Sequence, residues 1–463
     1  MSGQTRNLVV IGQGAAGLAA ALTAAEQARG SVAVTLIDKA PEEEAGGNTR
    51  WSPSNMRMAS PERVEPSFVH DMLTATKFQG DESYFARLAT DAPSTAKWLQ
   101  SHGIEFIQPP YYLSKGPPRI QPVGGGGNLI KVFTQAAIKA GVTLRYGCVA
   151  REITTSNERI AGVMIEQSGT RTTLPADAVV LACGGFQGSA AMMRTHLGDG
   201  AETMRLISPG TRFNTGDGIA MALELGADKS GDWNGAHCEP VDARSKSSAP
   251  VVLVYPYGIV VDKTGRRIFD EGGGLMHETW EWLARNIHFN TPGSIAYAIL
   301  DSRLTDITDY QRAIRSEVAP ARADTLAELA KLIGVDPDGL AATVANYNAA
   351  CVGDPKLFDA TRLDGLAAAR TLQPPKSNWA RAIRTPPFLA YPLVGAVAYT
   401  FGGLATDARA RVLRQGAPIP GLYAAGEITG HFYATAPNAV SVLRAFVFGR
   451  IAGAEAIAEL ANR

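Results

Sequence analysis

The beginning of the chain alternates short apolar runs with a helix-forming stretch. Residues 8–11 are a β-branched apolar run, and residues 32–37 are a second run of the same kind. Between them, an alanine-rich stretch over 18–29 favours a helix, because alanine has the highest helix propensity. A glycine-rich turn separates the first run from this helix. The pattern predicts a strand, a turn, a helix and a second strand that form one βαβ unit.

The rest of the chain continues the alternation and then changes texture. Apolar patterns predict helices over 67–103 and 129–140, and strands over 142–146, 148–154, 160–166, 170–175 and 178–182. From about residue 232 aromatic residues and irregular stretches become more frequent, and the strand–loop–helix pattern returns only near the carboxyl end. We therefore predict an α/β fold in which an α+β domain (233–390) is inserted into a domain formed by 1–232 and 391–463.

Composition narrows the class of protein. The chain has 463 residues, of which 45% are hydrophobic and 19% charged, so it is expected to fold rather than to be disordered. Lysines and arginines balance aspartates and glutamates at 44 each, so no overall charge attracts nucleic acid. No apolar run is long enough to span a membrane, and residues 1–6 do not resemble a secretion signal. We expect a cytoplasmic protein that is not membrane-spanning, and the scattered cysteines predict no metal site.

The glycine turn has the spacing of a dinucleotide-binding motif. Gly12, Gly14 and Gly17 form a G-x-G-x-x-G pattern between the first strand and the helix. In this setting the first glycine allows the turn, the second lets a pyrophosphate approach, and the third allows helix–strand packing. Asp38, at the end of the second strand, stands where a carboxylate accepts hydrogen bonds from a ribose. The pattern predicts a bound dinucleotide.

Two further glycine-containing segments favour FAD over NAD. Gly46 and Gly47 follow the second strand, and Gly426 with Glu427 lies near the carboxyl end. A ligand contacted by both ends of the chain must be long, and a second fingerprint for a nicotinamide cofactor is missing. We therefore expect FAD.

Motifs dispersed over almost the whole chain resemble the flavoprotein family of fumarate reductases and succinate dehydrogenases. Within that family they look most like the bacterial FAD-dependent tricarballylate dehydrogenases. The motifs are Gly46-Gly-Asn-Thr49, Gly210-Thr-Arg-Phe-Asn-Thr-Gly216, Phe269-Asp-Glu-Gly272, Asn346-Tyr-Asn-Ala-Ala-Cys351, Thr400-Phe-Gly-Gly-Leu404 and Phe448-Gly-Arg-Ile-Ala-Gly453.

The resemblance implies a Rossmann-like FAD-binding domain of the GR2 type with a mobile capping domain. Substrate would lie between the cap and the flavin, and the last helix would point its amino terminus at the flavin. Some relatives bind FAD covalently through a histidine beyond the Gly-Gly motif, and residues 49–52 contain none, so FAD is expected to be non-covalent. The implied cofactor contacts are Gly12, Gly14, Ala15, Ala16, Gly17, Asp38, Lys39, Gly46, Gly47, Asn48, Thr49, Val149, Ala182, Cys183, Gly184, Asp217, Gly426, Glu427, Ser441, Val442 and Leu443.

The substrate-binding pattern of the family is incomplete in this chain. His237 matches one of two histidines that clamp a dicarboxylate, and Ala398 stands at the place of the other. The clamping arginine falls near Ala436, and the proton-donating arginine falls within 273–279, which contains His277 and no arginine. Carboxylates are usually held by an arginine that donates two hydrogen bonds to them. The absence of the family's arginines therefore counts against fumarate and tricarballylate as substrates.

Other side chains could replace the missing groups. A histidine can carry a proton near neutral pH, an arginine can hold a carboxylate, and a tyrosine can donate to a carbonyl oxygen. Each type also has a purely structural alternative: a surface-loop histidine, an arginine in a surface ion pair or a core aromatic residue. The catalytic candidates are His237, His277, Arg444, Arg212, Tyr399 and Tyr433.

The resemblance implies an FAD-dependent dehydrogenase or reductase acting on CH–CH groups. It would interconvert a saturated and an α,β-unsaturated small organic acid by hydride transfer at flavin N5, as tricarballylate dehydrogenases and fumarate reductases do. One alternative is a ketone-activated ring desaturase similar to 3-ketosteroid dehydrogenases, which use tyrosines at the substrate. Another is a flavin-binding protein without turnover. The expected partners are the acid or enone substrate and an external electron acceptor, such as a quinone-linked membrane protein.

Overall fold

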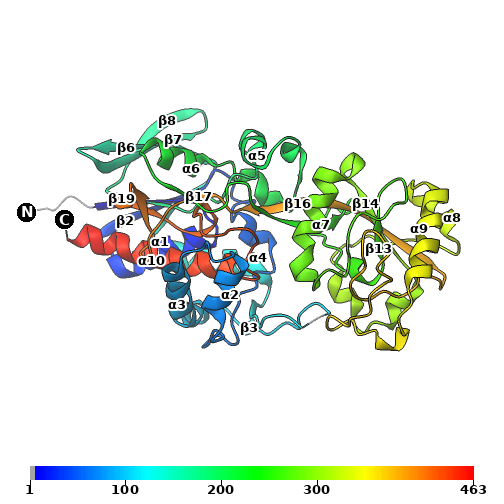
Figure 1. Cartoon of the computed structure of the whole chain (residues 1–463). Coiled ribbons are helices and arrows are strands. Elements are labelled where there is room, and N and C mark those ends of the chain that lie inside the picture. Colours follow the sequence, from blue (N-terminus) through cyan, green and yellow to red (C-terminus); the bar gives the residue numbers. More distant parts are fainter. Residues whose placement is uncertain (1–5, 114, 463) are drawn as a thin grey trace, which may run out of the picture.

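The computed structural model describes residues 6–113 and 115–462, which form two lobes side by side (Figure 1). The first lobe contains a sheet in the order β18-β19-β9-β1-β2-β5, with all neighbours parallel except β18 and β19. Strands from both ends of the chain thus share one sheet, which confirms the α/β fold and the predicted βαβ unit. The strands are β1 (Arg6–Ile11), β2 (Val32–Ile37), β5 (Thr143–Arg145), β9 (Ala178–Leu181), β18 (Arg411–Arg414) and β19 (Ala417–Ala424).

Helices and a small antiparallel sheet surround this parallel sheet. The small sheet consists of β6 (Cys148–Ser156), β7 (Arg159–Gln167) and β8 (Thr170–Pro175), as the strand predictions for this region indicated. The helices are α1 (Ala15–Ala28), α2 (Phe68–Ala75), α3 (Glu82–Ser101), α4 (Gly125–Lys139), α5 (Ala190–Leu197), α6 (Asp217–Glu224) and α10 (Ser441–Ala461). The single helix predicted over 67–103 is therefore two, because Lys77 and Phe78 adopt left-handed φ angles of 49° and 56° that interrupt it.

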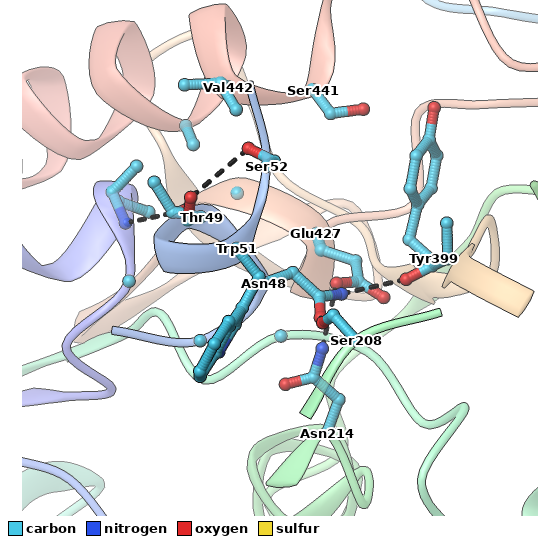
Figure 2. A pocket seen from close by; sticks show the side chains of 18 of the residues that line it. Asn48, Thr49, Trp51, Ser52, Ser208, Asn214, Tyr399, Glu427, Ser441 and Val442 are labelled. Atoms are coloured by element: carbon cyan, nitrogen blue, oxygen red, sulfur yellow. Dashed lines mark hydrogen bonds between the residues drawn. The ribbon is translucent and has the colours of Figure 1, made fainter. Parts of the chain in front are cut away.

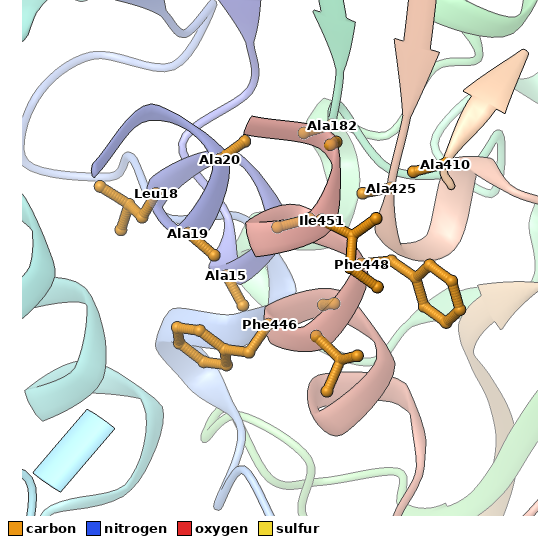
Figure 3. Packing of buried hydrophobic residues seen from close by; sticks show 14 of the residues in the cluster. Ala15, Leu18, Ala19, Ala20, Ala182, Ala410, Ala425, Phe446, Phe448 and Ile451 are labelled. Carbon is orange, nitrogen blue, oxygen red and sulfur yellow. The ribbon is translucent and has the colours of Figure 1, made fainter. Parts of the chain in front are cut away.

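The crossing of α1 and α10 forms the centre of the first lobe's core (Figure 3). Small side chains on both helices let their backbones approach. A Cβ on Gly449 would lie 2.4 Å from the backbone oxygen of Ala16, and a Cβ on Gly453 would lie 2.3 Å from that of Ala20. The alanine-rich composition of α1 therefore serves packing as well as helix propensity, and the crossing fixes where α10 begins.

The second lobe is built on the long strand β16, one end of which reaches back to the first lobe (Figure 1). Its sheet has the order β10-β16-β14-β13, and β12 and β15 also pair with β16. The elements are β10 (Arg205–Leu206), β12 (Ala236–Asp242), β13 (Ile259–Val261), β14 (Ala296–Leu300), β15 (Ala321–Ala323), β16 (Phe388–Thr400), α7 (Met276–Asn290), α8 (Leu326–Ile333) and α9 (Pro337–Ala350). The domain limits at 232 and 390 stay a prediction.

A proline-rich segment over 108–120, here called the strap, runs from the first lobe to the second and back (Figure 1). It leaves β3 (Phe106–Ile107) and returns at β4 (Gln121–Pro122), which pair with each other. In the second lobe the Lys115 amide donates to the Thr361 carbonyl at 3.0 Å, and Tyr112 joins the apolar core around α7. The strap therefore connects the lobes by packing as well as by the chain.

None of the helices in the described part of the chain has the length and apolar character needed to cross a lipid bilayer. The expectation about a secretion signal concerns residues 1–6, nearly all of which lie outside the described residues.

Candidate active site

A cavity of about 310 Å³ lies where the carboxyl ends of β1, β2 and β9 meet the start of α10, the strap and the second lobe. The cavity lies at this edge of the sheet because the loops that follow parallel strands all lie at the same edge. Both ends of the chain and its middle contribute to the lining.

The glycine turn between β1 and α1 forms one end of the cavity. A Cβ on Gly12, whose φ is 104°, would lie 2.5 Å from the Ala182 oxygen, and one on Gly17 would lie 1.7 Å from the Gly12 oxygen. Gly14 is different: the nearest atom to its Cβ position is the Thr49 hydroxyl, 3.9 Å away. This open space borders the start of α1, where Gly14 has no side chain to cap the helix and the Thr49 hydroxyl accepts from the Ala15 amide at 3.2 Å, so the amides that follow Ala15 stay available. Free N–H groups beside open space suit a phosphate.

Asp38 directly follows β2 and also lines the cavity. Its carboxylate accepts hydrogen bonds from the backbone amides of Gln13 at 2.7 Å and Ala40 at 2.8 Å. Burial raises the pKa of this carboxyl group, although both hydrogen bonds oppose the shift. Next to it, the Lys39 ammonium pairs with Asp217 at 2.8 Å. A carboxylate held rigidly beside a phosphate-sized space fits the ribose end of a dinucleotide.

Hydrogen-bonded polar side chains line the middle of the cavity (Figure 2). The Asn48 amide donates to the Ala398 carbonyl at 2.8 Å and accepts from Ser208 at 3.0 Å. Glu427 accepts from Asn214 and from the Thr400 backbone amide, both at 3.2 Å. Burial raises the pKa of Glu427 from 4.5 to about 7, against these hydrogen bonds.

The amino terminus of α10 faces the same space, with Ser441 and Val442 opposite the Asn48 group in Figure 2. No side chain caps this helix, and its first turn carries no acidic residue. Its unpaired N–H groups and positive dipole end would stabilise negative charge in the cavity. Arg444, in the first turn, is buried, donates to the Thr429 carbonyl at 3.2 Å and lies over the Phe432 ring.

The second lobe contributes a charged group centred on His237. The imidazole Nδ1 lies 2.9 Å from Glu281 on α7, and Nε2 lies 3.3 Å from Glu239 on the same strand. Burial disfavours the charged ring, but Tyr399 and the two carboxylates outweigh it and hold the pKa of His237 well above 6.5. Burial would raise the pKa of Glu239, but His237 and Arg315 together hold it below the ordinary value. We therefore describe an imidazolium between two carboxylates.

A β-bulge in the pairing of β12 with β16 lies next to His237. His237 pairs with Tyr399, but Cys238 pairs with Val397, so Ala398 is the extra residue in β16. Its carbonyl is free to accept from Asn48 and, at 3.0 Å, from Gln187. The Tyr399 ring is stacked on His237 with the centroids 4.9 Å apart.

Two arginines that sequence reasoning missed complete the cavity wall. Arg119 comes from the strap, and its guanidinium carbon lies 4.9 Å from the centre of the Tyr112 ring. Arg315 comes from the second lobe and donates to the Tyr112 hydroxyl at 3.4 Å. Trp280 on α7 contacts both Tyr112 and His237 edge to face. The contact between Arg315 and Tyr112 joins residues 203 positions apart, so no local sequence pattern predicts it.

The cavity brings together most of the residues named from the sequence. Among the catalytic candidates, His237, Tyr399 and Arg444 line it. The lining cofactor candidates are Gly12, Gly14, Ala15, Ala16, Asp38, Lys39, Gly47, Asn48, Thr49, Ala182, Cys183, Gly184, Asp217, Gly426, Glu427, Ser441 and Val442. Four others, Gly17, Gly46, Val149 and Leu443, are not part of the described lining; Gly17 instead packs against Gly12.

The structure does not bring the remaining catalytic candidates to the described lining of the cavity. Arg212 is on the surface, in an ion pair with Glu44. The Tyr433 hydroxyl accepts from the Gly231 amide at 3.0 Å, which ties it to a neighbouring loop. His277 packs its ring edge against Tyr111 at 5.1 Å, and burial lowers its pKa. Arg212 matches its structural alternative, a surface ion pair, whereas His277 is a partly buried residue of α7 and not a surface-loop histidine.

Comparisons with known proteins agree with this geometry. The family model described as FAD binding domain matches residues 7–439. A probable fumarate reductase of Shewanella frigidimarina (strain NCIMB 400) is 28% identical over 97% of this chain and 74% of its own length. A 4-oxocyclohexanecarboxylate 2-dehydrogenase of Sinomonas cyclohexanicum is 30% identical over 77% of this chain and 64% of its own length. The open conformation of a flavocytochrome c3 fumarate reductase matches with a TM-score of 0.77 and 25% identity, over 99% of this chain and 79% of that one.

Proposed function

Since the chain belongs to the FAD binding domain family and is an FAD-dependent oxidoreductase acting on carbon–carbon bonds, we propose that it interconverts the saturated and α,β-unsaturated forms of a small organic acid. FAD supplies or accepts the hydride at flavin N5. The glycine turn would hold its pyrophosphate, Asp38 its ribose, and the start of α10 its flavin end. No histidine follows the Gly-Gly motif in residues 49–52, so we propose non-covalent binding.

The observation that carries the substrate class is that Arg119 and Arg315 both contact Tyr112 and both line the cavity. Neither stands where the family pattern places an arginine, yet together they restore the positive charge that a carboxylate needs. The Arg119 Nε atom is buried without a hydrogen-bonding partner among the described residues. A buried donor of this kind favours an anionic ligand, because an unpaired one is costly.

The aromatic residues around these arginines have a second role. Tyr112, Trp280 and Tyr399 surround the charged group and reduce the space for water. Fewer water molecules strengthen each ion–carboxylate contact, because the local dielectric constant falls. A bound carboxylate would also withdraw electrons from the adjacent carbon and make its proton more acidic.

Replacement of each arginine tests the substrate class. In the FAD-loaded enzyme, Arg119→Met and Arg315→Met should each raise the Kd or KM of the acid about 10- to 100-fold, because each removes a charge-assisted contact. The matched control is Arg212→Met, which removes an exposed arginine away from the cavity and should change neither constant. The probes are succinate, tricarballylate and 3-phenylpropanoate in the oxidative direction, and fumarate, aconitate and cinnamate in the reductive direction, followed by flavin absorbance without oxygen. No response to any of these acids would overturn the proposal.

A ketone-activated ring desaturase is the second candidate. Tyr399 supports it, because this residue lines the cavity and its hydroxyl interacts with Ser441 at the start of α10. The relative from Sinomonas cyclohexanicum is named for a substrate with both a ring ketone and a carboxylate. Flavin bleaching by cyclohexanone, cyclohexanecarboxylate and 4-oxocyclohexanecarboxylate would separate the two candidate functions. Bleaching by cyclohexanone alone favours the ring desaturase. Bleaching only by the compounds that carry a carboxylate favours the oxidoreductase of organic acids.

We also propose that an external redox partner exchanges electrons with the bound flavin. Reduction or reoxidation of the purified enzyme by a soluble viologen or quinone would show that a second protein can supply this step.

A further inference from the structure

The cavity wall of the second lobe contains a carboxylate with one unused oxygen. Glu239 makes its hydrogen bond to His237 through Oε1. Its Oε2 has no hydrogen-bonding partner among the described residues, and the side chain keeps 17% of its exposure, on the cavity side. The carboxylate is thus held at one oxygen and open to a ligand at the other.

The position of Glu239 sets it apart from the other carboxylates that line the cavity. Asp38 and Asp217 lie at the ribose end. Two backbone amides donate hydrogen bonds to Asp38, and Lys39 forms an ion pair with Asp217. Glu427 lies at the sheet edge, held by Asn214 and Thr400. Within the described lining, Glu239 is the carboxylate that belongs to the same wall as the two arginines.

Strand and helix geometry align Glu239 with a proton source. Residues two apart on a strand share one face, so His237 and Glu239 lie side by side on β12, and α7 presents Glu281 to the other ring nitrogen. The distances are 3.3 Å from Glu239 to Nε2 and 2.9 Å from Glu281 to Nδ1. Glu239 and His237 both line the cavity, and Glu281, which lies outside its described lining, contacts the far ring nitrogen of His237.

Arg119 and Arg315 have a different proposed role, because they would pair with the substrate carboxylate. The Tyr399 phenol is a weak acid here, since burial raises its pKa. A carboxylate that contacts an imidazolium can accept a proton from the substrate. For the reverse reaction, the imidazolium can transfer a proton to the carboxylate.

We propose that Glu239 is the catalytic acid–base that exchanges a proton with the α-carbon of the substrate, with His237 as its proton reservoir and Glu281 as the residue that positions His237. This inference rests on the proposed function. In the oxidative direction the α-C–H bond breaks, its proton moves to Glu239 Oε2, and its electron pair forms the new π bond as the β-hydrogen leaves as hydride to FAD. In the reductive direction Glu239 delivers the proton to the α-carbon as the β-carbon receives the hydride.

The groups around Glu239 determine how the rate depends on pH. They are His237 on its own strand, Tyr399 on β16 and Glu281 on α7, both of which act on His237, and Arg315 with its neighbour Tyr112 on the facing loops. Reduction needs a protonated His237, so its rate should fall as the pH rises through the raised pKa of that ring. Oxidation needs an ionised Glu239 and should fall only in acid, below its lowered pKa.

The test uses the FAD-loaded full chain. Glu239→Gln should lower the rate at which cinnamate or fumarate reoxidises the dithionite-reduced enzyme by about 100- to 10,000-fold, the usual share of general acid catalysis. The Kd for the same acid, read from the flavin spectrum of the oxidised enzyme, should change by less than about threefold, because Arg119 and Arg315 stay in place. Glu166→Gln is the matched control: it changes an ion-paired strand glutamate on β7, away from the cavity.

A second arm separates proton transfer from a structural effect. His237→Gln should remove the alkaline decline of the reduction rate, and Glu281→Gln should move that decline to lower pH while the Kd stays unchanged. Incorporation of deuterium from D₂O at the α-carbon of succinate or 3-phenylpropanoate, followed by NMR, should be lost in Glu239→Gln. If the wild-type enzyme turns these acids over and Glu239→Gln keeps its rate and exchange, the proton role of Glu239 is wrong. If the wild type neither binds nor converts any of them, the proposed function fails first.

Discussion

At the scale of single residues, the cavity contains polar atoms that its own side chains do not satisfy. The indole nitrogen of Trp51, the amide oxygens of Asn55 and Asn438 and Nε of Arg119 are buried without hydrogen-bonding partners among the described residues, and all four residues line the cavity. Buried polar groups without partners destabilise a fold. Their concentration at one cavity indicates that a polar ligand satisfies them, and it makes FAD binding a contribution to stability.

Glu427 should make the stability of the FAD-free protein depend on pH. Its folded-state pKa is about 7, raised from 4.5 by burial. Between these values the folded protein holds a proton that the unfolded chain has lost, so the free energy of unfolding should fall as the pH rises from about 4.5 to about 7. The contribution is of the order of 3 kcal/mol, at about 1.4 kcal/mol per pKa unit. Urea unfolding at pH 5 and pH 7 measures it.

Glu427→Gln serves as the comparison, because glutamine keeps the shape and does not titrate. The difference between the unfolding free energies at the two pH values should be smaller in the variant. Equal differences in both proteins would show that Glu427 is not the group responsible.

Some residues of the cavity can be predicted from the sequence and others cannot, because only some of them are positioned by local contacts. Gly12, Gly14 and Asp38 follow from a short motif whose spacing is fixed by one βαβ unit, and the structure brings all three to the cavity. Arg119 and Arg315 could not be found in this way, because their place depends on a loop that crosses between lobes. His277 lies outside the described lining of the cavity, because proximity in a family pattern does not fix the direction of a side chain.

At the scale of elements, the start of α10 is aimed by its crossing with α1. The backbones meet at glycines on one helix and alanines on the other, and any added atom pushes the helices apart. The last helix, which the family resemblance implied at the flavin, spans Ser441–Ala461. The sequence did not reveal its partner, because a small-residue face can pack against many surfaces.

Gly449→Ala should push α1 and α10 apart where they cross and displace the start of α10. Its Cβ would lie 2.4 Å from the Ala16 backbone oxygen, which cannot move without shifting α1. We expect a lower melting temperature, by several degrees for a cost of about 1–3 kcal/mol, and weaker FAD binding measured by flavin fluorescence.

The matched control is Gly127→Ala in α4. This glycine is exposed, and its Cβ would lie 3.6 Å from the nearest atom, an ordinary contact. Alanine is the better helix former, so this variant should be as stable as the wild type or more so. Equal melting temperatures for the two variants would contradict the packing argument.

At the scale of the whole molecule, the strap joins the two lobes beside the cavity. Tyr111 packs against His277 at the start of α7 and against the Arg119 guanidinium, 4.4 Å from the ring centre. Composition predicted two domains, and the family resemblance predicted a cap. Neither predicted that a segment of the first lobe would hold the second, because the proline-rich pattern of 109–122 indicates only that the segment is irregular.

Tyr111→Ala should loosen the strap without changing the FAD site, since Tyr111 is not part of the described cavity lining. We expect faster hydrogen exchange in residues 108–120 and in the first turn of α7, an unchanged Kd for FAD and a raised KM for the acid. Tyr111→Phe keeps the ring and removes a hydroxyl that is buried without a partner, so it should behave like the wild type. Faster exchange in Tyr111→Phe as well would show that ring packing is not what holds the strap.

The path of the strap also bears on how substrate preference could be inherited. Arg119 belongs to the stretch of gene that encodes the flavin lobe, whereas Arg315 belongs to the stretch that encodes the opposite lobe. A recombination event that exchanged the second lobe for that of a relative would remove one of the two arginines proposed to bind the substrate carboxylate and leave the other in place. On this proposal, transfer of the substrate preference to a related enzyme would require both stretches of gene to be moved together.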